Sequence, residues 1–144
     1  MKNKPLLVLY VLVLVLAGAF VFSEMDDNQR DIFGSERQTK YTLYVGMNDK
    51  DSQEQTYGLN EAKQVMFMIV RKYTGGCTFY EAEGCWYDDE KKVTFTEKTL
   101  VCVLLDTTQE AVKSIMDEAL KVFNQSSILL ETEEVRGAFY TGNN

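Results

Sequence analysis

Two segments with helical spacing, each lying between two strand patterns, constrain the fold of this chain most. The first helical segment is predicted to be capped by Asn60 and to end at Gly75-Gly76. The second follows Thr107 and Glu110, which match a capping box. Segments rich in β-formers occupy Tyr41–Met47, Cys77–Ala82 continued by Cys85–Tyr87, Val93–Phe95 continued by Thr99–Leu105, and Ile128–Phe139.

The resulting order, β-α-β-β-α-β, predicts an α+β domain of the ferredoxin-like kind. We expect a four-stranded antiparallel sheet with the first and third strands in its centre. The segment Thr99–Leu105 is almost wholly apolar, as expected of a central strand. Both helices should cover one face of the sheet, which leaves the other face open to solvent, a ligand or a partner chain.

The N-terminal segment Met1–Ser23 predicts export. Two lysines precede Leu6–Phe22, a run of 17 apolar or glycine residues, and an acidic stretch follows. This pattern indicates an apolar helix that is either a cleaved signal peptide or a retained membrane anchor. Both alternatives place the rest of the chain outside the cytoplasm. The expected organisation is therefore 1–23 targeting segment, 24–39 polar linker, 40–140 ferredoxin-like domain and 141–144 tail.

The composition excludes several classes of function. All 22 acidic residues and 13 of the 15 basic residues follow Ser23, so the exported part carries 13 − 22 = −9. Such a surface repels nucleic acid. The chain has no histidine, which excludes Ser-His and Cys-His catalytic pairs and His-ligated zinc. We expect no metal and no cofactor. The expected partners are the membrane, through the N-terminal segment, a second copy of the chain, an envelope protein or a small ligand.

Three cysteines in an exported domain raise the question of a disulfide. If Asp89-Glu90 form a two-residue hairpin loop, residues whose numbers sum to 179 face each other. Cys77 then lies opposite Cys102, within disulfide range. A bulge at Gly84 would shift this register, and three small buried thiols are the alternative.

The candidate ligand or interface residues are four aromatic side chains and one arginine: Tyr44, Tyr80, Trp86, Tyr87 and Arg136. Strand alternation places several of them on the open face or at its rim. Aromatic rings beside an arginine bind planar or anionic ligands, and the same residue types are enriched at protein interfaces. The structural alternative is that Trp86 packs over its hairpin and Arg136 forms an ion pair.

Two groups of acidic residues are weaker candidates. Glu81 and Glu83 lie two apart on one strand and share a face, as paired acid–base carboxylates would. Asn48, Asp49 and Asp51, with Glu54, lie in one loop but lack the spacing of an EF-hand. We interpret both groups as solvated surface, and no residue is predicted to be catalytic.

Several short motifs are similar to those of a bacterial family of small exported domains of unknown function. The most specific resembles the family's hairpin signature G-x-T…A-x-G-x-W-x-D, here Gly76-x-Thr78 and Ala82-x-Gly84-x-Trp86-x-Asp88. Others are Leu43-Tyr44-Val45-Gly46, which is similar to L-Y-x-G, Glu97-Lys98-Thr99 in place of E-x-S, and Ile128-Leu129, Arg136 and Phe139 in the last strand.

Two departures from this family lie in turns. Lys91 stands where the family usually has a glycine, and the proline near its E-x-S element is missing. The resemblance spans about Thr42 to Phe139. It implies a ferredoxin-like fold and an envelope location, and it implies no activity.

These observations lead to one main functional interpretation and one alternative. The main interpretation is a non-catalytic binding or interaction module, not an enzyme, that uses the open face of its sheet. The alternative is a small-molecule enzyme of the dimeric α/β-barrel type with a pocket near Tyr44, Trp86 and Arg136. That alternative requires Arg136 and a carboxylate to converge on one cavity.

Overall fold

A computed structural model describes residues 35–142. The segment predicted to target or anchor the chain, 1–23, and most of the predicted linker lie outside the described residues. The chain divides into two compact units, of which Arg37–Arg136 holds both helices and nearly all of the sheet. Within residues 35–142, no helix is long and apolar enough to span a membrane.

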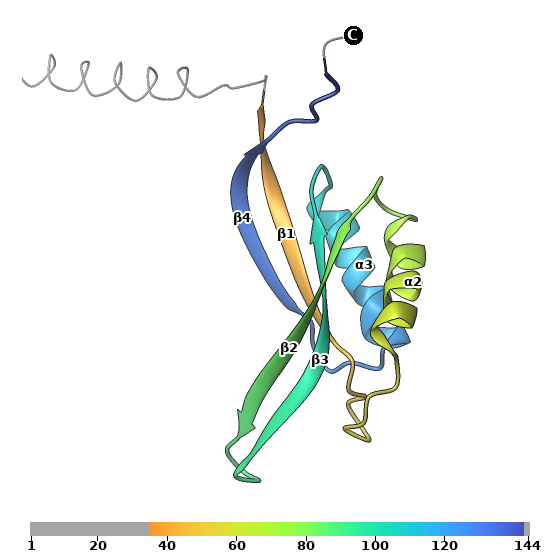
Figure 1. Ribbon diagram of the computed structural model, residues 1–144, viewed down its shortest axis with the longest axis vertical. Coiled ribbons are helices and arrows are strands. Elements are labelled where there is room, and N and C mark those ends of the chain that lie inside the picture. Colours follow the sequence, from red (N-terminus) through yellow and green to blue (C-terminus); the bar gives the residue numbers. More distant parts are fainter. Residues whose placement is uncertain (1–34, 143–144) are drawn as a thin grey trace, which may run out of the picture. The chain divides into compact units, whose positions relative to one another are not determined.

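The predicted order of elements is confirmed. The chain forms β1 (Glu36–Gly46), α2 (Leu59–Val70), β2 (Thr78–Asp88), β3 (Val93–Leu104), α3 (Gln109–Val122) and β4 (Leu129–Gly137). The strands form one antiparallel sheet in the order β2-β3-β1-β4, so β1 and β3 are central as expected (Figure 1). The domain is therefore an α+β fold.

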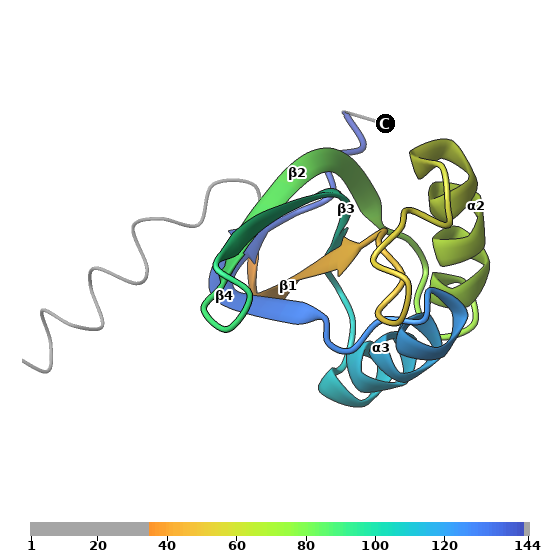
Figure 2. The same cartoon turned by 90° about the horizontal axis from the view of Figure 1, so that it is seen from below.

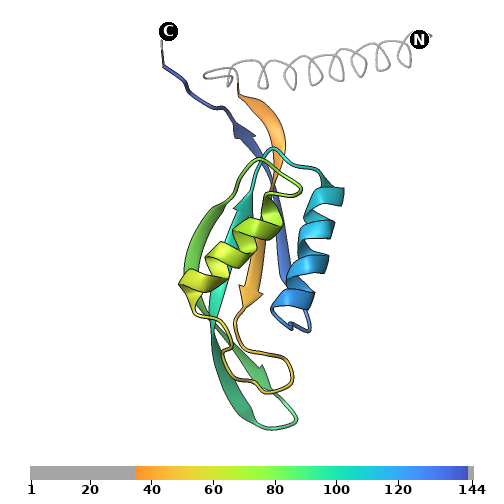
Figure 3. The same ribbon diagram turned by 90° about the vertical axis from the view of Figure 1, so that its right-hand side faces the viewer.

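The core lies between the sheet and the two helices, which cover the same face of the sheet (Figures 2 and 3). Alternate residues of the central strands point into this core. Leu43 and Val45 of β1, and Leu100 and Leu104 of β3, are fully buried there with residues of α2 and α3. Residues of the other parity, such as Tyr44, Gly46, Glu97 and Thr99, therefore lie on the uncovered face.

The helix ends differ slightly from the sequence prediction. The N-cap of α2 is Gly58 and not Asn60. In α3 the cap is Thr108, whose side chain accepts a hydrogen bond from the Ala111 backbone N–H, so the predicted capping box at Thr107 is one residue too early. Both helices nevertheless form within the segments whose helical spacing predicted them.

The β2–β3 hairpin corrects the predicted register. Pairing runs without a bulge from Thr78 to Asp88, and the loop has four residues, 89–92. The Asp88 carboxylate accepts hydrogen bonds from the backbone N–H groups of Glu90 and Lys91, and Lys92 has a φ of 55°. This longer turn moves the register by two, so Phe79 and not Cys77 lies opposite Cys102.

Candidate functional site

A hollow of about 700 Å³ lies where β1, β2 and β3 meet the loops that follow β1 and α3. We call it the Glu97 hollow, after the carboxylate in its wall. Its lining comprises strand residues Tyr44, Gly46, Ala82, Glu83, Gly84, Cys85, Trp86, Glu97 and Thr99, and Asn48, Lys50, Gln53, Gln125, Ser126, Ser127 and Leu129. Its volume is within the range of about 300–1,000 Å³ that is usual for small-molecule sites.

The Glu97 side chain lies over the bare backbone of Gly46. A Cβ built on Gly46 would lie 2.6 Å from Cδ of Glu97, which is closer than any real side chain approaches. The Glu97 carboxylate also accepts a hydrogen bond of 3.4 Å from the backbone N–H of Asn48. A glycine on β1 is therefore what allows a β3 carboxylate to lie in this wall.

A second glycine borders the same carboxylate on the other side. Gly84 of β2 pairs with Glu97, and a Cβ built there would lie 3.1 Å from the Thr99 hydroxyl. The bulge considered at Gly84 is absent. The glycine instead allows side chains of β3 to lie close to the backbone of β2. Two glycines on neighbouring strands thus open the space in which Glu97 and Thr99 lie.

Among residues 35–142, Glu97 forms no ion pair, whereas the neighbouring carboxylate of Glu83 does. Glu83 accepts a hydrogen bond of 2.5 Å from Lys98, which lowers the pKa of Glu83. Lys50 is the one lysine in the lining of the hollow. Glu97 is accordingly the lining carboxylate whose charge a bound cation would balance.

Trp86 provides an aromatic surface at the edge of the hollow. Its ring stacks on that of Phe95 on β3 with 4.7 Å between ring centroids and 22° between planes. The side chain is still 45% exposed, so a large part of it is open to a ligand. A supported indole ring of this kind can stack on a planar ligand or face a cation.

Tyr44 connects the hollow to β4. Its hydroxyl donates a hydrogen bond of 2.8 Å to the Glu131 carboxylate, which raises the pKa of Tyr44. On the same pair of strands, the Lys40 ammonium group donates to Glu133, which raises the pKa of Lys40. The Tyr44 ring is thus held against the sheet while it forms part of the lining.

One wall of the hollow is a loop that a single carboxylate organises. Asp49 accepts hydrogen bonds from the Asn124 side chain at 2.7 Å and from the backbone N–H groups of Asp51 and Ser52 at 2.9 and 3.0 Å. The Asn124 bond, followed by those from Ser52 and Asp51, lowers the pKa of Asp49 to about 2. This explains the acidic loop as a structural turn tied to the end of α3.

We expect Asp49→Asn to reduce stability most at neutral pH. The pKa of Asp49 is lower in the folded protein than its ordinary value of 3.8, so the ionised carboxylate stabilises the folded state. This contribution is complete above about pH 4. It is lost as the pH falls through about 2. Urea unfolding of both proteins at pH 7 and pH 2.5 measures the difference. An equal difference at both pH values would contradict this role for Asp49.

The five predicted ligand residues do not come together. Tyr44 and Trp86 line the Glu97 hollow, and Tyr80, Tyr87 and Arg136 do not. Tyr80 is on the uncovered face but 57% exposed, and Tyr87 has the parity of the helix-covered face. Arg136 lies near the end of β4, beyond Glu134, which accepts a hydrogen bond from Thr39 near the start of β1. The hollow is at the other end of β1.

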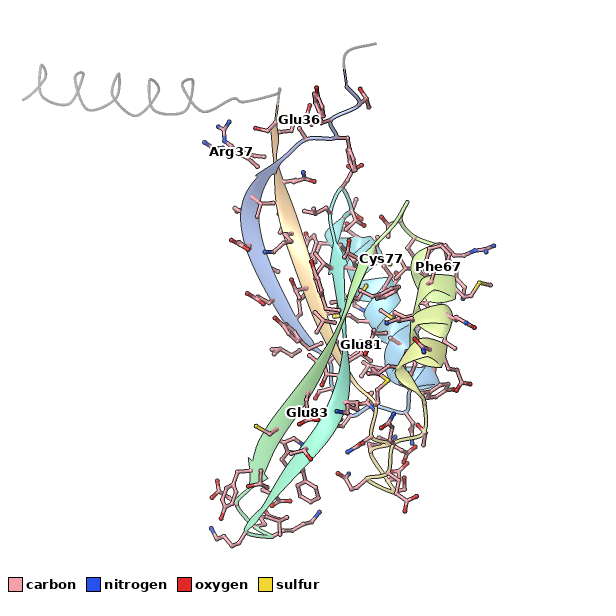
Figure 4. The ribbon with its side chains drawn as sticks, viewed as in Figure 1. Glu36, Arg37, Phe67, Cys77, Glu81 and Glu83 are labelled. Carbon is pink, nitrogen blue, oxygen red and sulfur yellow. The ribbon has the colours of Figure 1, made fainter. Side chains whose placement is uncertain are left out.

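Glu81 and Glu83, both labelled in Figure 4, share a face of β2, as predicted, but their ion-pair partners differ. Glu81 forms an ion pair of 2.5 Å with Lys63 of α2. Glu83 is paired with Lys98 on β3. The two carboxylates therefore do not form a proton-sharing pair.

Glu97, Gly46 and the loop residue Lys50 were not among the predicted site residues, and Asn48 was considered only as part of the acidic loop. Glu97 and Gly46 occur only within the motifs of the family resemblance. Their meeting depends on the β1–β3 register, in which Gly46 pairs with Thr99. The signal that would have found them is the presence of three motifs on neighbouring strands at one end of the sheet.

Comparison with protein families identifies the family of this chain. A family model described as "Protein of unknown function (DUF3574)" matches residues 40–139. The chain belongs to this family. The match covers every helix of the DUF3574 domain and nearly all of its sheet. No curated protein matches the sequence.

Two solved structures are similar to the DUF3574 domain. One is a phage SAM lyase in complex with S-methyl-5'-thioadenosine, with 18% sequence identity and a TM-score of 0.56. The other is a phage SAM lyase in the apo state, with 17% identity and a TM-score of 0.54. Each alignment covers 72% of this chain and 87% of the lyase chain. At this identity, the likeness shows a shared fold.

This likeness corrects the main functional interpretation. The sequence favoured a non-catalytic binding or interaction module that is not an enzyme. The similar structures are instead those of an enzyme, which favours the alternative of a small-molecule enzyme. The details of that alternative are also corrected, because Arg136 does not line the hollow and Glu97 does.

Proposed function

We propose that this domain is a small-molecule enzyme with its active site in the Glu97 hollow, and that its substrate is an S-adenosyl sulfonium compound such as SAM. The observation that carries the proposal is the presence of Glu97 and Trp86 in the lining of one hollow. A carboxylate and an aromatic ring match the two parts of such a substrate, a sulfonium cation and a planar base.

The fold supports the choice of this substrate class. The similar phage enzyme is named a SAM lyase and was solved with S-methyl-5'-thioadenosine. Ligand and reaction do not follow from fold alone, so the chemistry of the hollow has to fit them independently. It does so through its size, through the stacked indole ring and through a carboxylate without an ion-pair partner among the described residues.

The roles of the residues follow from this assignment. Trp86 would stack on the adenine ring, and Glu97 would lie near the sulfonium. In an elimination, the C–S bond breaks, its electron pair goes to sulfur, and a base takes up the proton that leaves carbon. Glu97 is our candidate for that base. The absence of histidine is no obstacle, since a carboxylate can fill this role.

Ligand binding can be measured through Trp86, because it is the only tryptophan of the chain. We expect SAM and S-methyl-5'-thioadenosine to change the fluorescence of the full chain in a saturable manner, since either would stack on Trp86. Methionine, which lacks the base, should cause no change. Liquid chromatography with mass spectrometry of the same samples measures the consumption of SAM.

The effect of Trp86 itself needs a different readout, because its replacement removes the signal. We expect Trp86→Ala to weaken SAM binding by calorimetry, and loss of stacking on a base typically costs about 1–3 kcal/mol. Tyr87→Ala, on the opposite face of the same strand, should bind as the wild type does. If the wild type neither binds nor consumes SAM, the proposed function is wrong.

A further inference from the structure

Two thiols, at diagonal positions of β3 and of the segment that leads into β2, lie on the helix-covered face of the sheet. Cys102 of β3 is fully buried in the core, and Cys77, directly before β2, is half-buried at its edge. Figure 4 labels Cys77 at the upper end of β2, above Glu81. Cys77 packs against the core cluster that contains Cys102, and all three cysteines of the chain are free thiols.

A hydrogen bond from the Cys102 thiol to a Cys77 thiolate would make the two thiols chemically unequal. It lowers the pKa of Cys77, because a thiolate there would accept the bond from Cys102. The same bond and burial raise the pKa of Cys102. A thiolate is the nucleophile in exchange with disulfides, so the more exposed sulfur is also the one that ionises more readily.

We propose that Cys77 and Cys102 form a thiol–disulfide exchange site that reacts with low-molecular-weight disulfides such as oxidised glutathione. The Cys77 thiolate attacks one sulfur of the small disulfide, and the other sulfur leaves as a thiolate. Cys102 then loses its proton and attacks Sγ of Cys77, which expels the second small thiol. The protein dithiol becomes an intramolecular disulfide, and the small disulfide becomes two thiols.

The backbone around Cys77 allows the sulfur atoms to approach. In the observed register Phe79 lies opposite Cys102, so Cys77 is the diagonal neighbour on the same face. Diagonal Cβ atoms are up to about 7–8 Å apart and a disulfide needs about 3.8 Å, so Cys77 has to move. It precedes the first paired residue of β2 and follows Gly75-Gly76, around which a Cβ would meet no atom within 4 Å. Movement of Cys77 would therefore leave the pairing of β2 with β3 intact.

The test uses the full chain with Cys85→Ser, which removes the exposed third thiol. The reduced protein is equilibrated with mixtures of oxidised and reduced glutathione, quenched and analysed by mass spectrometry. We expect a loss of two hydrogen masses and a peptide that links Cys77 to Cys102. Because closure requires movement of the segment before β2, a moderate excess of reduced glutathione should restore both thiols.

Two variants separate the steps. With Cys102→Ala the reaction should stop at one glutathione attached to Cys77, because no second thiol can displace it. With Cys77→Ala the buried Cys102 should remain unmodified while the protein is folded. Native mass spectra and circular dichroism show whether each variant is folded. In the Cys85→Ser protein, absence of the linked peptide at every glutathione ratio would overturn the proposal, whatever becomes of the proposed enzymatic function.

Discussion

Replacement of Glu97 by glutamine should lower kcat/KM for SAM by about 10²–10⁴, the usual contribution of a general base. Glutamine keeps the size and polarity of the side chain but cannot take up the proton. Glu97 lies against Gly46 and accepts a hydrogen bond from the Asn48 backbone N–H. A glutamine side chain can do the same, so it should occupy the same space. We therefore expect the loss to appear mainly in kcat, with little change in thermal stability.

The matched control is Glu81→Gln on the neighbouring strand. Glu81 is also a strand carboxylate, but it pairs with Lys63 and does not line the hollow. Its replacement should change kcat/KM by less than a factor of about three, since exposed ion pairs contribute about 0–1 kcal/mol to stability and this one does not contact substrate. Equal losses in the two variants would mean that Glu97 acts through general charge and not as a base.

The order of elements was predictable because it depends on local patterns. Periodicity over each helix and alternation along each strand can be read within a short window. The register between β2 and β3 could not be predicted in this way, because it depends on the length of one turn. The Asp88 carboxylate and the positive φ of Lys92 make a four-residue loop, where the sequence suggested two residues. Since strand alternation has a period of two, this shift kept every side chain on its predicted face.

The site was predictable only in part, because it depends on which strand ends meet. Tyr44 and Trp86 were selected by residue type, and both line the hollow. Arg136 was selected in the same way, but β4 runs antiparallel to β1, so its far end lies away from the hollow. Glu97 is one of 22 acidic residues, and residue type alone could not distinguish it. The bare backbone of Gly46 distinguishes it, and that contact is non-local.

Replacement of Gly46 by alanine should lower kcat by about 10²-fold while the domain remains folded. The new Cβ would overlap the Glu97 carboxylate, which is the mobile end of a flexible side chain. The side chain can swing away, so the fold should lose about 1 kcal/mol or less, below the usual range for overpacking. Glu97 would leave its place in the hollow, and a displacement of about 1 Å can lower a rate about 10²-fold.

Gly75→Ala is the matched control, because a Cβ at Gly75 meets no atom within 4 Å. It should leave both kcat and the unfolding midpoint close to those of the wild type.

A double-mutant cycle with Glu97→Gln then separates displacement of Glu97 from a general disturbance of the sheet. If Gly46→Ala acts by moving Glu97, it should cost little further activity once Glu97 has been replaced, so the two effects will not add. Additive losses would mean that Gly46 contributes to the hollow through its own backbone and not by positioning the carboxylate. In that case, the assignment of Glu97 as the base would rest on the Glu97→Gln result alone.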